Sequence, residues 1–177
     1  MIKKKICMVG LYGVGKTSLV KRFVESIFGE RYLTTVGVKI DKKDVVVDGK
    51  TVTLAIWDIA GEDDLAEFKV SNVRGASGYI LVADGTRQAS LHKAVDLHSR
   101  ITAALGPLPF VLVVNKVDLR AEWEIQPEAI AALTEDGWKS IEASAKTGDA
   151  VEQLFYTLTK DMLDRDAAQA AADDDEV

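Results

Sequence analysis

The stretch GLYGVGKTS at residues 10–18 follows directly after the apolar run ICMV at residues 6–9. It fits the pattern Gly-x-x-x-x-Gly-Lys-Thr, in which glycines let backbone N–H groups turn toward phosphates and a following helix adds partial positive charge. In such a loop Lys16 reaches the β- and γ-phosphates, and the Thr17 hydroxyl holds Mg²⁺. The stretch therefore predicts a site for a nucleoside triphosphate with Mg²⁺. Its expected contacts are Gly10, Tyr12, Gly13, Val14, Gly15, Lys16, Thr17 and Ser18.

Length and charge restrict the class of protein. The chain has 177 residues, enough for one buried core and too few for two ordinary domains. Its net charge of −6 argues against nucleic acid as a main partner, because phosphate backbones are bound by clustered basic side chains. The single cysteine, Cys7, cannot form an internal disulfide, so we expect a cytoplasmic protein. No run of about 18 apolar residues is present, so no transmembrane helix is expected.

Apolar runs and amphipathic stretches alternate along the chain. Strands are expected at residues 5–9, 36–47, 51–58, 79–84, 110–115 and 140–143, and helices at 16–25, 65–73, 90–105, 127–134 and 150–165. Continuous apolar runs at 79–84 and 110–115 are typical of parallel strands covered on both faces, and Asp48-Gly49 indicates a hairpin. This order predicts an α/β doubly wound fold with one antiparallel edge hairpin. Ligands of such folds bind beyond the carboxyl ends of the parallel strands, where the motifs of this chain fall.

The C-terminal residues differ in composition from the rest. The expected domain covers residues 1–165, and residues 166–177 form an acidic, alanine-rich tail. The alanines could extend the last helix, but acidic residues at a helix C-terminus oppose its dipole. We therefore expect fraying from about Ala172.

A second motif, NKVD at residues 115–118, follows the expected strand FVLVV. The Asp118 carboxylate can accept hydrogen bonds from N1–H and the amino group of guanine, whereas adenine would leave it unpaired. The Ser-Ala-Lys stretch at 144–146 follows the next strand and can offer a backbone N–H to guanine O6, and the stem of Lys116 can lie along the base. The sequence thus predicts guanine. The expected contacts are Asn115, Lys116, Asp118, Ser144, Ala145 and Lys146.

Two further stretches lie where they could sense the γ-phosphate. Asp58 ends the strand LAIWD and can order the Mg²⁺ shell, while the Gly61 N–H can meet the γ-phosphate. Upstream, Thr34 or Thr35 could complete the Mg²⁺ shell only while that phosphate is present. Two loops that depend on one phosphate are the physical basis of a switch.

Together these motifs resemble those of the small GTPases of the Ras superfamily, and in particular the Rab-like branch. The matching stretches are residues 10–17, 35–38, 57–61, 74–76, 115–118 and 142–146. The resemblance implies a six-stranded sheet flanked by helices, bound GTP or GDP with Mg²⁺, and slow hydrolysis tuned by other proteins. Those partners would be effectors, an exchange factor and a GTPase-activating protein acting on a monomer. It also favours Thr35 over Thr34 as the metal ligand, and it suggests that Phe28 packs edge-on against guanine, although Phe28 is equally explained as a helix-end core residue.

Three features depart from the family pattern. Where the family has a glutamine that orients the attacking water, this chain has Glu62, which can accept a proton from water but is repelled by the phosphate charge. The alternative is that Glu62 points to solvent within an acidic loop. Tyr12 is bulky where relatives often carry a small residue, and this bulk should crowd an arginine supplied by a partner. Tyr12 could equally fold outward or offer its hydroxyl to the γ-phosphate. The chain ends DDDEV without a cysteine, so we expect no lipid anchor, as in stand-alone prokaryotic Ras-like proteins, unless a lipid signal has been truncated.

The leading hypothesis is a switch that hydrolyses GTP to GDP and phosphate. In it Lys16, Gly61 and Glu62 are the catalytic residues, and Thr17, Thr35 and Asp58 hold Mg²⁺. The alternative is a GTP-binding recruitment module with negligible hydrolysis, and Glu62 and Tyr12 are the features that favour it.

Overall fold

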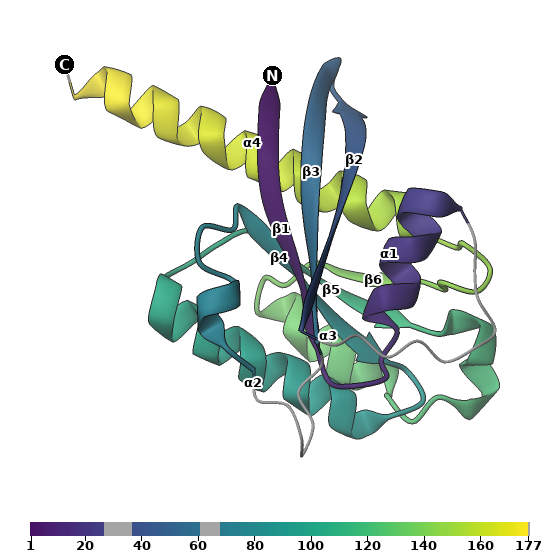
Figure 1. Cartoon of the computed structure of the whole chain (residues 1–177). Coiled ribbons are helices and arrows are strands. Elements are labelled where there is room, and N and C mark those ends of the chain that lie inside the picture. The colour runs from purple at the N-terminus through teal and green to yellow at the C-terminus, as the bar shows by residue number, and fades with distance from the viewer. Residues whose placement is uncertain (27–36, 61–67, 177) are drawn as a thin grey trace.

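The computed structural model of the chain describes residues 1–26, 37–60 and 68–176. The described residues form one six-stranded sheet in the order β2-β3-β1-β4-β5-β6 (Figure 1). Strand β2 pairs antiparallel with β3, and the other neighbouring strands are parallel. This topology confirms the predicted doubly wound α/β class with one antiparallel edge strand. The strands are β1 (Ile2–Gly10), β2 (Val38–Val47), β3 (Lys50–Ile59), β4 (Gly78–Asp84), β5 (Phe110–Asn115) and β6 (Ser140–Glu142).

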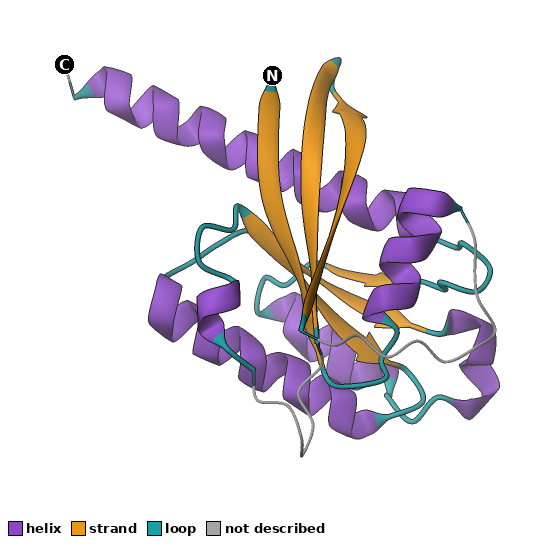
Figure 2. Cartoon of the chain, viewed as in Figure 1, coloured by secondary structure: helices purple, strands orange, loops and turns teal. Residues whose placement is uncertain are grey.

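Helices cover both faces of the sheet (Figure 2). Helices α1 (Lys16–Glu25) and α4 (Val151–Asp175) pack on one face, where Phe23 and Phe155 stack with ring centroids 3.9 Å apart. Helices α2 (Gln88–Leu105) and α3 (Pro127–Glu135) pack on the other face. Two short 3-10 helices, η1 (Val70–Asn72) and η2 (Val117–Glu122), lie in the connections.

Strand β1 contributes side chains to both hydrophobic cores because successive side chains of a strand point to opposite faces of the sheet. Ile6 and Met8 join the core beneath α1 and α4, whereas Cys7 and Val9 join the core beneath α2. All of them are buried, which explains the unbroken apolar run before the glycine-rich loop. The loop is thereby fixed at the centre of the sheet.

Three elements differ from the sequence prediction. The helix expected at 65–73 is wrong for its described part, where only the 3-10 helix η1 is present. Strand β1 begins at Ile2, earlier than predicted, because it already pairs with β3 there, with Ile2 beside Val52. Lys4 pairs with Asp166 of α4, and Lys5 lies 3.7 Å over the Trp57 ring. Helix α4 includes the alanines of the tail, which have the highest intrinsic helix propensity, and it ends at Asp175, beyond the expected fraying point at Ala172. Figure 1 shows this end of α4 extending beyond the sheet.

Within the described ranges, no helix has both the length and the apolar character required to cross a bilayer.

Candidate nucleotide-binding site

The glycine-rich loop turns at the carboxyl end of β1 and runs directly into α1. Gly13 and Gly15 have φ values of 78° and 102°, in the left-handed region that favours glycine. A Cβ on Gly15 would lie 2.3 Å from Asn115 Nδ2, and a Cβ on Gly10 would lie 2.5 Å from the Val82 carbonyl oxygen. Close packing therefore favours glycine at positions 10 and 15, and backbone conformation favours it at positions 13 and 15.

Lys16 lies across the inside of this loop. It is buried, and its Nζ donates to the carbonyl oxygens of Gly10 at 3.2 Å and Leu11 at 3.1 Å. Burial lowers the pKa of Lys16 to about 8, while the Asp58 carboxylate opposes the shift. A buried ammonium held by neutral carbonyls, at a helix N-terminus, suits a polyphosphate, which would compensate its charge.

Thr17 and Asp58 meet beside the loop. The Thr17 hydroxyl donates to Asp58 Oδ2 at 2.6 Å, and Asp58 is buried at the end of β3. Hydroxyl and carboxylate oxygens are the hard donors that Mg²⁺ prefers, and this ion commonly takes its other ligands from phosphates and water. No cluster of three or more His, Cys, Asp or Glu residues with metal-binding geometry exists in the part of the chain that the structure describes. The pair therefore fits a magnesium ion held jointly with a nucleotide.

The NKVD stretch is joined to the glycine-rich loop by its side chains. Asn115 Nδ2 donates to the Val14 carbonyl at 3.0 Å, and Asn115 Oδ1 accepts from the Ala145 N–H at 3.2 Å. Lys116 Nζ lies 2.7 Å from Asp84 Oδ2 and 3.4 Å from the Gly13 carbonyl oxygen. Asn115 and Lys116 thus connect the ends of β4, β5 and β6 to the phosphate loop.

Asp118 lies beyond these two residues and is exposed. It accepts a hydrogen bond from the buried Ser144 hydroxyl at 2.6 Å, and that hydroxyl in turn accepts from the Thr147 N–H at 3.1 Å. These bonds fix the carboxylate beside the Ser-Ala-Lys stretch. Lys146 is exposed on the same side, as expected for a residue at the edge of a bound base.

The sequence analysis missed three residues that support the site. Arg22 of α1 donates to the carbonyl oxygens of Ala145, at 2.8 Å, and of Lys146. Arg87, at the start of α2, donates through Nη1 to the Tyr12 carbonyl at 2.8 Å. Asp84 carries the carboxylate that faces Lys116, and its position at the end of an apolar strand could have indicated it.

The sequence of the chain also matches a known protein family. The model of the Ras family matches residues 5–164 of the chain. The chain belongs to the Ras family.

Its relatives place this Ras-family chain in the Rab-like branch. It is 35% identical to the Ras-related protein Rab-13 of Canis lupus familiaris over 161 residues, which cover 90% of this chain and 79% of the relative. It is 36% identical to the Ras-related protein SEC4 of Saccharomyces cerevisiae, covering 88% of this chain and 73% of that protein. It is 35% identical to the GTP-binding protein YPTM2 of Zea mays, covering 95% and 84%. The chain is therefore a small GTP-binding switch protein and a GTPase.

Most of the predicted site residues of this Ras-family chain come together at one end of the sheet. Ser18 lies in the first turn of α1, and Tyr12 is 37% exposed at the rim of the loop. Four predicted site residues lie outside the described residues: Phe28, Thr35, Gly61 and Glu62.

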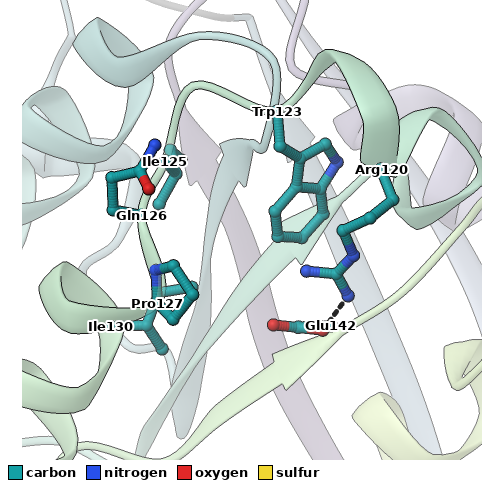
Figure 3. A pocket seen from close by; sticks show the side chains of 7 residues that line it. All are labelled: Arg120, Trp123, Ile125, Gln126, Pro127, Ile130 and Glu142. Atoms are coloured by element: carbon teal, nitrogen blue, oxygen red, sulfur yellow. Dashed lines mark hydrogen bonds and ion pairs between the residues drawn. The ribbon is translucent and has the colours of Figure 1, made fainter.

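A separate cavity of about 190 Å³ lies behind the NKVD stretch (Figure 3). None of the predicted nucleotide contacts lines it. Its walls include Trp123, whose Nε1 donates to the Lys116 carbonyl at 2.8 Å, and Arg120, which lies 3.9 Å over the Trp123 ring and pairs with Glu142. The ring also occupies the space that a Cβ on Gly85 would need. These contacts give the cavity wall a structural role, which is to hold the backbone of Lys116.

Proposed function

We propose that this chain cycles between GTP- and GDP-bound states, hydrolyses GTP to GDP and phosphate, and presents two phosphate-dependent loops to effectors. The observation that carries the proposal is the contact between the two nucleotide motifs, in which Asn115 donates to the Val14 carbonyl at 3.0 Å. It brings Lys16, suited to phosphates, and Asp118, suited to guanine, to the same end of the sheet.

The described residues suggest a division of roles. The loop amides and Lys16 stabilise phosphate charge, and Asp118 accepts from the guanine N1–H and amino group while Ser144 holds it in place. Thr17 and Asp58, with Thr35, would hold Mg²⁺. When bound, this ion neutralises charge on the phosphate oxygens. Phe28 is proposed to pack at the edge of the base, with Gly61 meeting the γ-phosphate.

The bases of the two proposed switch loops are joined. The Ala60 N–H donates to the Gly37 carbonyl at 2.9 Å, so the residue before 61–67 is bonded to the residue after 27–36. These two flanking residues, Gly37 and Ala60, adjoin β2 and β3, and Ala60 lies two residues after Asp58. Loss of the γ-phosphate would then affect both loops together, and the Ala60–Gly37 hydrogen bond supports such a coupled change. The proposed effector surface comprises residues 33–38 and 65–73, and an exchange factor and a GTPase-activating protein are the proposed regulators.

The experiment that tests hydrolysis is single-turnover GTP cleavage by the purified chain with Mg²⁺, compared with Glu62→Gln and, as a control for lost charge in the same acidic stretch, Asp64→Asn. We expect wild type and Asp64→Asn to hydrolyse GTP slowly and at similar rates, with a changed rate in Glu62→Gln alone. Stable GTP binding without hydrolysis over hours would instead support the recruitment-module alternative, for which Glu62 and Tyr12 are the sequence arguments. Competition between GTP and ATP for the empty protein tests base selectivity in the same preparation.

A further inference from the structure

Three consecutive carbonyl groups of the phosphate loop are each held by a side chain from a neighbouring loop. The Tyr12 carbonyl accepts from Arg87 Nη1 at 2.8 Å, the Gly13 carbonyl from Lys116 Nζ at 3.4 Å, and the Val14 carbonyl from Asn115 Nδ2 at 3.0 Å. Arg87 follows β4, while Asn115 and Lys116 follow β5. The outer side of the loop is therefore lined by donors over three successive peptide groups.

This pattern determines where the amides of the loop point. In a trans peptide group the C=O and N–H bonds are antiparallel, and the described residues contain no cis peptide bond. A donor that holds the Tyr12 carbonyl outward therefore turns the Gly13 N–H inward, and the next two donors do the same for Val14 and Gly15. Successive inward N–H groups form a concavity that binds anions. A cationic donor also polarises the peptide group, which makes its N–H a stronger donor.

Hydrogen bonds hold the backbone of Arg87 on both sides. Its backbone N–H donates to the Asp84 carbonyl at 2.9 Å, and its own carbonyl accepts from the Ser90 N–H at 3.0 Å and the Ser90 hydroxyl at 2.7 Å. The Asp84 carboxylate meanwhile lies 2.7 Å from Lys116 Nζ. The two cations that hold Tyr12 and Gly13 are thus anchored on the same residue.

We propose that Arg87 is a positioning residue of the phosphate loop, which acts through the Tyr12 carbonyl to aim and polarise the Gly13 N–H toward the nucleotide phosphates. This inference rests on the proposed nucleotide site. Arg87 would act on GDP and GTP alike, because the peptide group that it holds belongs to the loop and not to the γ-phosphate.

The variants Arg87→Ala and Arg87→Lys test the role, and Arg165→Ala is the matched control. Arg165 is also half-buried and also donates through Nη1 to a backbone carbonyl, that of Pro107 at 2.9 Å, but it lies on α4 away from the loop. Dissociation of fluorescent GDP and of a non-hydrolysable GTP analogue is measured with Mg²⁺. The Gly13 amide is followed in ¹H–¹⁵N correlation spectra of the GDP-bound proteins.

We expect Arg87→Ala to release both nucleotides about fivefold faster, as for the net loss of one typical hydrogen bond. Its Gly13 amide proton should move upfield, while Arg87→Lys, which keeps a cationic donor, recovers part of both changes and Arg165→Ala shows neither. An unmoved Gly13 amide in Arg87→Ala would overturn the inference, and so would an effect confined to the GTP analogue, which would indicate contact with the γ-phosphate. If the wild type bound no guanine nucleotide, the proposed function itself would fail, and this result is distinct from either of those.

Discussion

Asn115 Nδ2 lies 3.0 Å from the carbonyl oxygen of Val14, 101 residues earlier in the chain, and this contact joins the end of β5 to the phosphate loop. The approach is close only because Gly15 has no side chain, since a Cβ there would lie 2.3 Å from the same nitrogen. Gly15 therefore allows the NKVD stretch to contact the phosphate loop, in addition to leaving the loop open to phosphate.

Gly15→Ala should lower the free energy of unfolding by about 3 kcal/mol, since it combines a left-handed conformation with a clash that displaces Asn115. It should also weaken GDP binding, because the Val14 carbonyl loses its donor. Urea unfolding and fluorescent GDP titration measure the two effects. Gly49→Ala is the matched control, because Gly49 has a φ of 77° but no neighbour within 4 Å of an added Cβ, and it should cost only about 1 kcal/mol. Equal losses in the two variants would show that the contact with Asn115 contributes nothing.

Removal of the Thr17 hydroxyl tests the magnesium site. In the structure this hydroxyl donates to Asp58 Oδ2 at 2.6 Å, so both oxygens are available to one ion. Thr17→Ala should release GDP about tenfold faster in the presence of Mg²⁺, while addition of a chelator should accelerate it little further. Thr17→Ser keeps the hydroxyl and should retain the full response to chelation. A chelator response in Thr17→Ala equal to that of wild type would remove Thr17 from the metal site.

Asp118→Asn tests recognition of the base. The substitution replaces two acceptors with one acceptor and one donor, so GDP affinity should fall about 10²- to 10³-fold. Xanthosine diphosphate, which carries an oxygen in place of the guanine amino group, should bind the variant better than it binds wild type. Asp149→Asn, an exposed change on the neighbouring loop, should leave both affinities unchanged. Unaltered preference for guanine in Asp118→Asn would contradict the assignment.

Features of the fold and site that depend on local sequence could be predicted, whereas contacts between segments remote in sequence could not. Continuous apolar strands and glycine-rich turns leave local patterns, so the sheet could be predicted, and the glycine-rich loop and Asp118 follow the ends of β1 and β5 as expected. Arg22 and Arg87 could not be, because each donates to backbone carbonyls of segments remote in sequence, and any exposed arginine has the same local pattern. The helix expected at 65–73 failed in its described part for another reason: its apolar spacing suits a short 3-10 turn as well as an α-helix.

An aromatic cluster away from the nucleotide site should make folding sensitive to acid. His98 of α2 lies between Phe110 and Trp138, with ring centroids 4.3 and 4.6 Å away, and its Nδ1 is 2.8 Å from the hydroxyl of buried Tyr79. Burial lowers the pKa of His98 below its usual 6.5. Burial also raises the pKa of Tyr79 to about 12, so this hydroxyl keeps its proton. A neutral His98 can accept that proton in a hydrogen bond, whereas a protonated ring cannot.

Because the folded state binds the His98 proton less readily than the unfolded state does, the contribution of His98 to stability should be constant well above pH 6.5 and should fall as the pH drops through that value. His98→Gln keeps an acceptor for Tyr79 but does not titrate, so it should lose less stability than wild type between about pH 7.5 and about pH 5. His92→Gln, an exposed change on the same helix, should follow the wild type. Urea midpoints at the two pH values measure the difference. If His98→Gln and wild type lost the same stability, the acid sensitivity would have to arise from other groups, and the cluster around His98 would have no part in it.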